Sequence, residues 1–352
     1  MDVPTKISIR LSFLFLFLSL GCAGFAQAGE SQEANTLTFY QENDIYSGTD
    51  RDYTNGLKFT WISQDLSEYR QNPHIPVWSY PLIENLPFVN EPGFQRTFSL
   101  SLGQNIYTPE DLQKYEQTDG DRPYAGIMYL EIGFHSRNYR RMDTIAIDIG
   151  IIGPHSYAEK SQKAVHEWTG SHYPNGWDSQ IKDEPILNLY YERKWKFIQG
   201  NKGIRGFDYD FVPHIGCAVG NAFTGINAGG QLRFGWNLPN DFGTFIIRPG
   251  SDTNAPLDVN DPRFFAEKKQ FGIHIFAAID SMAVQRNITL DGNLMRSSYH
   301  VDKEPFVASF ACGVGMIIHR FKITYSYVFT TKVFETQEDE QNFGAVTISY
   351  TF

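Results

Sequence analysis

The sequence predicts an all-β protein, a transmembrane antiparallel β-barrel of about 12 strands with a short helix in an extracellular loop. Three observations support this prediction. Segments that alternate apolar and polar residues recur along the chain, the chain ends on such a segment, and no apolar run after residue 28 is long enough for a transmembrane helix. Without such a helix, the chain can cross a bilayer only as a closed sheet, because every backbone polar group must be satisfied there.

The final segment shows the alternation most clearly. From Val346 to Phe352, aliphatic or aromatic residues alternate strictly with threonine and serine, and the chain stops on an aromatic residue. One fully apolar face and one small polar face suit a strand that stands between lipid and a polar lumen. A half-buried strand of a soluble protein is the alternative. A terminal Phe after such a strand resembles the insertion signal of bacterial outer-membrane barrels.

The N-terminal segment, residues 1–28, has the features of a secretory signal peptide. Lys6 and Arg10 precede an apolar run over 11–20, and small residues at 26 and 28 suit cleavage. The run is too short to span a bilayer. A lipid anchor at Cys22 is a minor alternative, because Ser19 stands where a leucine is expected. We therefore expect a single barrel domain over 29–352.

The amino-acid composition limits which molecules the protein is expected to bind. The formal charge of −10 argues against nucleic acid, and an anionic lipid would need a local cluster of cations or a metal ion. The mature chain would keep only Cys217 and Cys312, which excludes a disulfide-stapled scaffold and a Cys-rich metal site. Both cysteines fall on the apolar face of non-neighbouring predicted strands, so we expect them to be unpaired and to face lipid.

The alternation predicts strands at the following positions. They are 36–44, 53–63, 96–106, 125–137, 143–152, 185–197, 209–220, 227–236, 269–281, 306–319, 320–333 and 343–352. Their polar faces carry charges of both signs, which in a small barrel predicts an interior filled by side chains rather than a wide pore. These charges are Lys58, Glu131, Asp148, Glu192, Lys194, Arg233, Asp280 and Lys322.

Strand parity assigns the connections to two sides. If both termini are periplasmic, the outer rim carries 45–52, 107–124, 153–184, 221–226, 282–305 and 334–342. Two connections on the opposite side, 64–95 and 237–268, are longer than the usual periplasmic turn. We expect ordered caps or short helices in them.

Chemistry-bearing residues gather in the outer connections. Residues 157–169 have the composition of a short helix that would end at Gly170. In that helix Gln162 and His166 share one face, able to look back at the first hairpin with Asn43 and Asp44. His166 could serve as a general base, although a surface histidine and purely structural turn residues are the alternative interpretations.

At this point the sequence resembles the lipid A 3'-O-deacylase family of Gram-negative outer membranes, the LpxR type. The resemblance rests on Asn43-Asp44, residues 52–54 with Gly56, Gln104 with Ile106-Tyr107 and Pro109, residues 120–122, 148–150 and 152–154, Gln162, His166, Gly170, Tyr173-Pro174 and Gln180-Ile181. It implies an outer-membrane barrel enzyme that performs calcium-dependent ester hydrolysis in the outer leaflet. The implied reaction releases the 3'-acyloxyacyl group of lipid A.

The same resemblance assigns the site residues. It implies His166, Asp44, Asn43 and Thr54 as catalytic residues, Lys114, Gln162 and Tyr173 as substrate-binding residues, and Asp44 and Asn43 as ligands of a calcium ion. His166 would remove a proton from water, Asp44 would orient His166 or hold the ion, and the metal and polar rim residues would stabilise the oxyanion. Where the family has an acidic residue shortly before the Tyr-Pro pair, this chain has Ser171-His172 and is one residue shorter.

Two other functions stay open from the sequence. An outer-membrane phospholipase with a Ser-His-Asn arrangement needs a serine one hydrogen bond from its histidine, and the nearest, Ser161, is five residues from His166 on another part of the helix. A non-enzymatic porin would show less chemistry at the rim. We expect lipid A or lipopolysaccharide and outer-membrane lipid as partners, with a monomer as the default because the apolar pattern marks no protomer interface.

Overall fold

The structure is a computed structural model that describes residues 34–47, 51–66, 77–85, 91–199, 206–248, 253–257, 261–264 and 271–352. The expected signal peptide, 1–28, lies outside the described residues. The strands are β1 (Thr36–Asn43), β2 (Asp52–Ile62), β3 (Gln95–Thr108), β4 (Ala125–Arg137), β5 (Arg141–Ile152), β6 (Glu184–Trp195), β7 (Ile198–Gln199), β8 (Phe207–Gly220), β9 (Phe223–Trp236), β10 (Phe271–Asn287), β11 (Phe306–Ile318), β12 (Phe321–Thr330) and β13 (Gln341–Thr351).

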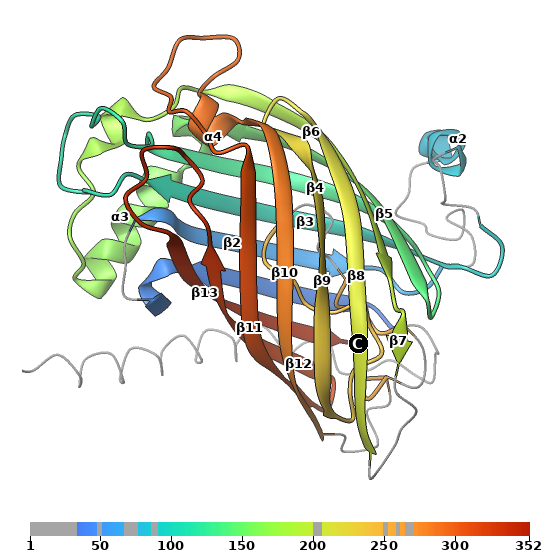
Figure 1. Cartoon of the computed structure of the whole chain (residues 1–352). Coiled ribbons are helices and arrows are strands. Elements are labelled where there is room, and N and C mark those ends of the chain that lie inside the picture. The colour runs from blue at the N-terminus through green and yellow to red at the C-terminus, as the bar shows by residue number, and fades with distance from the viewer. Residues whose placement is uncertain are drawn as a thin grey trace, which may run out of the picture. The chain divides into compact units, whose positions relative to one another are not determined.

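These strands form one closed antiparallel sheet (Figure 1). β1 pairs with both β2 and β13, and β6 closes the cylinder by pairing with β8. β7 contributes only a two-residue ladder against β8, so twelve long strands make the wall. The predicted fold class is therefore confirmed.

Most observed strand bounds lie within two residues of the expected ones, but β9 begins at Phe223 rather than at residue 227, and β12 ends at Thr330 rather than at residue 333. β10 was expected to end at residue 281 but continues to Asn287. Its register against β9 shifts between Val284 and Arg286, and a bulge of this kind inverts the pattern of faces. The strand predicted from the alternation is therefore shorter than the observed strand.

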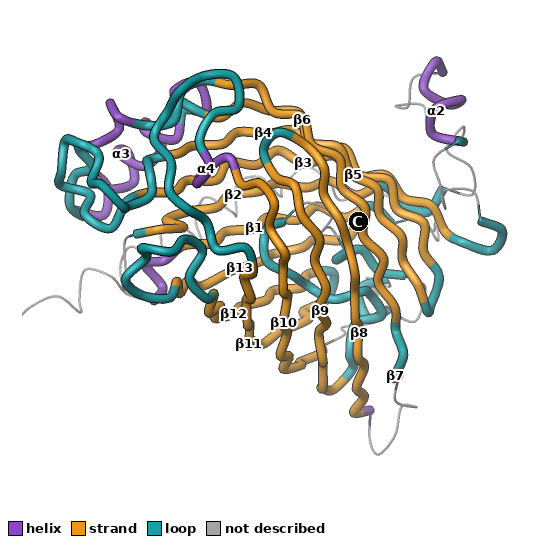
Figure 2. The backbone as a smooth tube through the Cα atoms, turned by 45° about the horizontal axis from the view of Figure 1, so that its top comes forward, coloured by secondary structure: helices purple, strands orange, loops and turns teal. Residues whose placement is uncertain are grey.

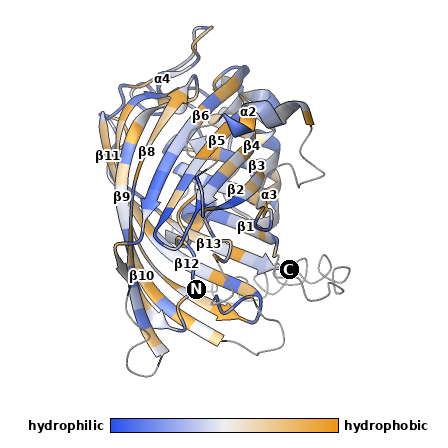
Figure 3. Ribbon diagram, turned by 90° about the vertical axis from the view of Figure 1, so that its right-hand side faces the viewer, coloured by the Kyte–Doolittle hydropathy of each residue, from blue (hydrophilic) through white to orange (hydrophobic). Residues whose placement is uncertain are grey.

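The outer face of the cylinder is apolar. Figure 3 shows bands of apolar and polar residues alternating along the strands, and the side chains of Leu187, Ile275 and Phe310 are exposed. Cys217 and Cys312 are free and exposed on this face, as expected. Among the described residues, no helix has both the length and the apolar character needed to cross a membrane.

The interior is filled with paired charges. All eight predicted interior charges are buried, and the amine of Lys58 lies 2.9 Å from a carboxylate oxygen of Glu131. Lys194 and Glu192 form a second pair at 2.8 Å. The prediction of a filled interior is thus confirmed.

The connection between β9 and β10 differs from our expectation. Its described residues form neither a cap nor a helix but fold back into the cylinder. Asp241 accepts hydrogen bonds from Arg233 (2.5 Å), Arg263 (2.9 Å) and Lys322 (2.6 Å). The physical reason is that inward cations on β9 and β12 need counter-charges, because an uncompensated buried charge is strongly destabilising.

The other long connection, 64–95, contains short helices as expected. Within its described part, η3 (Val77–Ser79) and α2 (Tyr80–Glu84) follow one another. Figure 2 shows α2 at one end of the barrel, and α3 (Ala158–Thr169) and α4 (Ile288–Asp291) at the other.

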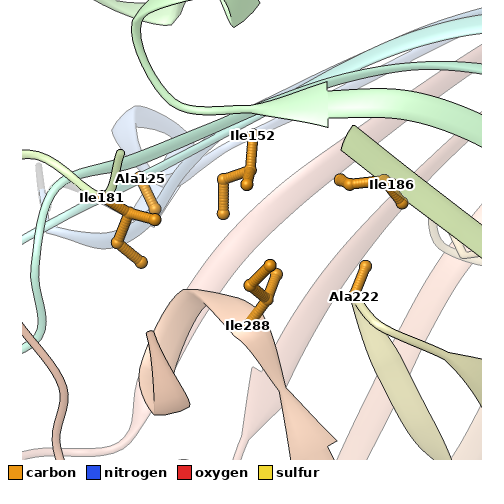
Figure 4. Packing of buried hydrophobic residues seen from close by; sticks show 6 residues of the cluster. All are labelled: Ala125, Ile152, Ile181, Ile186, Ala222 and Ile288. Carbon is orange, nitrogen blue, oxygen red and sulfur yellow. The ribbon is translucent and has the colours of Figure 1, made fainter. Parts of the chain in front are cut away.

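The mouth near α4 is closed by an apolar cluster (Figure 4). It consists of Ala125, Ile152, Ile181, Ile186, Ala222 and Ile288. Ile288 is the first residue of α4, directly after β10, and packs with residues of β4 and β5, which lie several strands away around the wall. A guanidinium nitrogen of Arg122 also donates to Thr289 Oγ1 at 3.2 Å. These contacts cross the mouth and cover the lumen.

Candidate functional site

The expected site residues gather at the end of the barrel that carries α3. Ala158 at the start of α3 contacts Gly126 at the start of β4, which pairs with the end of β3. The end of β3 in turn pairs with the start of β2, and Figure 1 shows α3 at this end of β2. The hairpin with Asn43 and Asp44 and the helix with His166 therefore emerge at the same end, as the sequence predicted.

Local sequence fixes both ends of α3. The helix starts after Tyr157, which has a left-handed conformation (φ 58°), and ends at Gly170 (φ 75°), whose N–H donates to the His166 carbonyl. A glycine is the usual residue in such a C-terminal cap. At its first turn, Ala158 packs against Gly126 of β4, where any Cβ would overlap the Ala158 and Ser156 side chains. The helix is thereby held directly on the barrel wall.

His166 lies in the last turn of α3 and is 5% exposed. Its Nδ1 is 2.5 Å from the carbonyl oxygen of His172. A carbonyl can only accept, so Nδ1 is the donor in this hydrogen bond. This backbone carbonyl orients the ring and lies in the segment 171–172, where this chain has Ser171-His172. A role of Asp44 in orienting His166 stays a prediction.

Gln162 lies one turn earlier on the same buried face of α3 and is 3% exposed. Its Oε1 accepts from the indole N–H of Trp177 at 2.7 Å. Its Nε2 is buried and has no hydrogen-bond partner among the described residues. Trp177, from η5 (Gly176–Ser179), was not predicted as a site residue. The sequence could have indicated it only through the rule that a buried indole N–H needs a hydrogen-bond acceptor.

The first hairpin positions Asn43 and Asp44. Asp44 opens η1 (Asp44–Ser47), is 1% exposed, and accepts from the backbone N–H of Arg51 at 2.6 Å. Asn43 donates to Asn55 Oδ1 (3.1 Å) and accepts from the N–H of Ile45 (2.8 Å). Both side chains are held by the hairpin that carries them.

Thr54 sits at an irregularity between β2 and β3. The register shifts between Tyr53 and Asn55, so Thr54 is the extra residue of a bulge. Its hydroxyl is buried 2.6 Å from the hydroxyl of Thr108, at the end of β3. Bulges commonly re-aim a side chain next to active sites.

Lys114 lies in the 107–124 connection, whose backbone contacts Asn175 and Gly176 shortly after Tyr173. Its amine is 3.4 Å from Thr118 Oγ1 and 3.9 Å from a carboxylate oxygen of Asp111. It lines an acidic pocket of about 330 Å³ between 107–124 and 334–342, together with Arg51 and Asp339. The structure therefore shows Lys114 among acidic side chains of its own rim.

Tyr173 follows α3 and is 47% exposed. The amine of Lys163 lies 5.1 Å from the centre of its ring. Lys163 also bonds Glu159 at 2.6 Å, and this bond raises the pKa of Lys163 above its ordinary value. Tyr173 and Lys163 thus form a cationic, aromatic flank on the helix that bears His166.

No group of three or more His, Cys, Asp or Glu side chains suited to a metal ion occurs within the described part of the chain. Calcium also takes amide and backbone carbonyl oxygens. The carboxylate of Asp44 and the amide oxygen of Asn43, adjacent on one hairpin, have that chemistry.

A closed twelve-stranded cylinder with an apolar outer face and a polar rim site defines an outer-membrane β-barrel. A family model described as "Outer membrane protein LpxR" matches residues 12–352, and the chain belongs to this family.

One solved structure agrees on the fold. LpxR from Salmonella typhimurium is 19% identical, with a TM-score of 0.69, over 90% of this chain and 100% of that chain. Two autotransporter domains are more distant. The β domain of Bordetella BrkA has 9% identity and a TM-score of 0.40 over 91% of this chain and 98% of that chain. NalP from Neisseria meningitidis has 8% identity and a TM-score of 0.38 over 98% of this chain and 96% of that chain. No curated protein matches the chain.

Proposed function

We propose that this protein is a calcium-dependent lipid A 3'-O-deacylase that hydrolyses the ester-linked 3'-acyloxyacyl group in the outer leaflet. The observation that carries the proposal is His166. It is a buried imidazole at the rim of a membrane barrel, and its Nδ1 donates to the His172 carbonyl. Membership of the LpxR family supports the substrate class.

His166 acts as the general base. Nε2 takes a proton from water while the water oxygen bonds to the ester carbonyl carbon. When the tetrahedral intermediate collapses, the bond from carbon to the sugar oxygen breaks and the imidazolium returns the proton to that oxygen. The products are a fatty acid and a free hydroxyl on the sugar. The His172 carbonyl holds the ring orientation through both transfers.

Gln162 stabilises the oxyanion in this mechanism. Its Oε1 is fixed by Trp177, which leaves the amide N–H groups of Nε2 as buried donors without a partner among the described residues. A preorganised donor of this kind is most effective where negative charge develops. Because α3 stacks residues four apart, the donor and the base lie on one face of the helix.

Asp44 and Asn43 would hold the calcium ion through oxygen ligands, and the ion would polarise the ester carbonyl. Thr54 supports the same hairpin through its hydroxyl contact with Thr108. In this proposal Tyr173 contacts the acyl or sugar part of the substrate, and Lys114 meets a phosphate or acyl oxygen at the edge of the rim.

The alternative functions receive less support. Ser161 uses its backbone N–H in the first turn of α3, with the Tyr157 carbonyl as acceptor, and lies off the buried face of Gln162 and His166. A porin needs an open lumen, whereas the apolar cluster around Ile288 covers one mouth and the Asp241 network fills the cylinder.

The test is incubation of the purified barrel with lipid A, with calcium or with a chelator, followed by mass spectrometry of the lipid products. We expect loss of one 3'-acyloxyacyl group only with calcium, and none with His166→Ala. The variant should still show the heat-modifiable migration of a folded barrel. Release of a glycerophospholipid acyl chain in place of the lipid A chain would overturn the assignment in favour of a phospholipase.

A further inference from the structure

A polar cleft of about 590 Å³ opens on the outer rim beside α3. We define it as the rim cleft. Its lining includes Glu159, Trp177, Asp178, Lys182, Ser298 and Tyr299. None of these residues takes part in the mechanism above, although Trp177 holds Gln162.

The rim cleft is preformed. Its two walls, the segment after α3 and the segment after α4, are joined by reciprocal hydrogen bonds between the backbone of Lys182 and the side chain of Asn293, at 3.0 and 2.8 Å. The amine of Lys182 adds a bond to the Ser297 carbonyl at 2.9 Å. A ligand binds a preformed cleft with a smaller free-energy cost, because the protein segments need not be ordered on binding.

The lining selects hydroxyl groups over anions. Glu159 and Asp178 contribute carboxylates, which accept hydrogen bonds. The charge of Glu159 is balanced by Lys163, so Asp178 is the carboxylate of this pair that repels anions. The lysine in the lining, Lys182, already donates to a backbone carbonyl. Tyr299 is 52% exposed and offers an aromatic face beside these acceptors. Aromatic surface with adjacent carboxylates fits the apolar face and the hydroxyl edge of a neutral sugar.

The position of the rim cleft connects it to the site. Glu159 lies on the flank of α3 that also carries Lys163 and Tyr173, one helical turn from Lys163, or about 6 Å along the axis. A glycolipid whose ester lies at His166 and which passes Tyr173 could continue along this flank into the cleft.

We propose that the rim cleft binds a neutral glycosyl unit of the saccharide attached to the lipid substrate. This inference rests on the proposed function. It assigns Tyr299 and Asp178 to substrate affinity and leaves the chemical step to residues on the buried face of α3.

The experiment compares two substrates in matched detergent micelles with calcium: lipid A without core sugars, and rough lipopolysaccharide that carries its core saccharide. We expect a KM about tenfold lower for the second substrate, with a similar kcat, as one additional subsite gives. Tyr299→Ala and Asp178→Ala should each raise the KM for rough lipopolysaccharide severalfold and leave the kinetics on lipid A unchanged. The matched control is Tyr139→Ala, an exposed tyrosine between β4 and β5 at the opposite end of the barrel.

A second measurement separates this inference from the hydrolase assignment. Free core oligosaccharide, stripped of lipid, is tested for binding by saturation-transfer NMR. Binding to the wild type and to Tyr139→Ala but not to Tyr299→Ala supports the cleft. Hydrolysis of both substrates with equal KM, and no oligosaccharide binding, would overturn the cleft and keep the deacylase. Oligosaccharide binding without hydrolysis of any lipid would overturn the deacylase.

Discussion

The Nδ1 atom of His166 lies 2.5 Å from the carbonyl oxygen of His172. The imidazole of His166 is therefore positioned by the main chain six residues later, at a place where this sequence has no acidic side chain. Because the partner is a backbone atom, its contribution does not depend on which side chain stands at position 172.

The first prediction follows from this contact. His172→Ala keeps the carbonyl and should change kcat for acyl release by less than about threefold, whereas His166→Ala should lower it by about 10²- to 10⁴-fold, the usual contribution of a general base. Single-turnover measurements on lipid A with calcium check both values. A loss of kcat for His172→Ala equal to that for His166→Ala would show that the imidazole of His172, and not only its carbonyl, is needed for acyl release.

The second prediction concerns Trp177. Trp177→Phe removes the 2.7 Å hydrogen bond to Gln162 but keeps an aromatic ring in the packing against Tyr124. The amide of Gln162 becomes free to rotate, so we expect kcat to fall about tenfold with little change in KM, a partial loss of oxyanion stabilisation. Gln162→Ala should cost more than Trp177→Phe. If the double variant is no worse than Gln162→Ala alone, the two residues act through one hydrogen bond.

The third prediction tests whether the contact between α3 and Gly126 of β4 positions this helix. Gly126→Val should displace α3 from β4, because a side chain at this position meets Ala158 and Ser156. We expect loss of acyl release with retained heat-modifiable migration, since the ladder between β3 and β4 remains. Limited proteolysis should cut the 153–184 connection faster than in the wild type. Unchanged cleavage and activity would show that α3 is positioned by other contacts.

The fourth prediction is a pH dependence. The bond with Glu159 raises the pKa of Lys163, so the pair favours the folded helix at neutral pH, below the ordinary lysine pKa, and loses this effect as the pH rises through the raised value. Lys163→Met should therefore weaken α3 by about 0.3 to 0.5 kcal/mol at neutral pH, and on the alkaline side this difference should vanish only above the raised lysine pKa. Proteolysis rates of the 153–184 connection across pH measure it, with Lys160→Met as the control. A difference that disappears between pH 5 and 8 would contradict the assignment.

The fifth prediction concerns the filled cylinder. Asp241→Ala leaves Arg233, Arg263 and Lys322 buried without their shared counter-charge, and removal of one partner from such a network costs about 3 to 5 kcal/mol. Urea unfolding followed by gel migration measures the cost. Glu116→Ala, at an exposed rim position, is the matched control and should change stability by less than about 0.5 kcal/mol. Equal stability of the two variants would mean that the network contributes little.

The sequence alone predicted the wall of the barrel and the helix at the rim. Strand positions follow from a two-residue period, and the shared face of Gln162 and His166 follows from a spacing of four residues in a helix. Both are local patterns, fixed by backbone geometry over a few residues. They fail where the period breaks, as at the bulge near the end of β10.

Tertiary structure decided the rest. The proton position on His166 depends on a backbone carbonyl that carries no sequence signal, and the indole that fixes Gln162 lies fifteen residues away. The turn of the 237–268 connection into the lumen depends on Asp241 meeting cations from three separate segments. Such contacts arise only when the sheet has closed, because closure brings together charges and donors that are far apart along the chain.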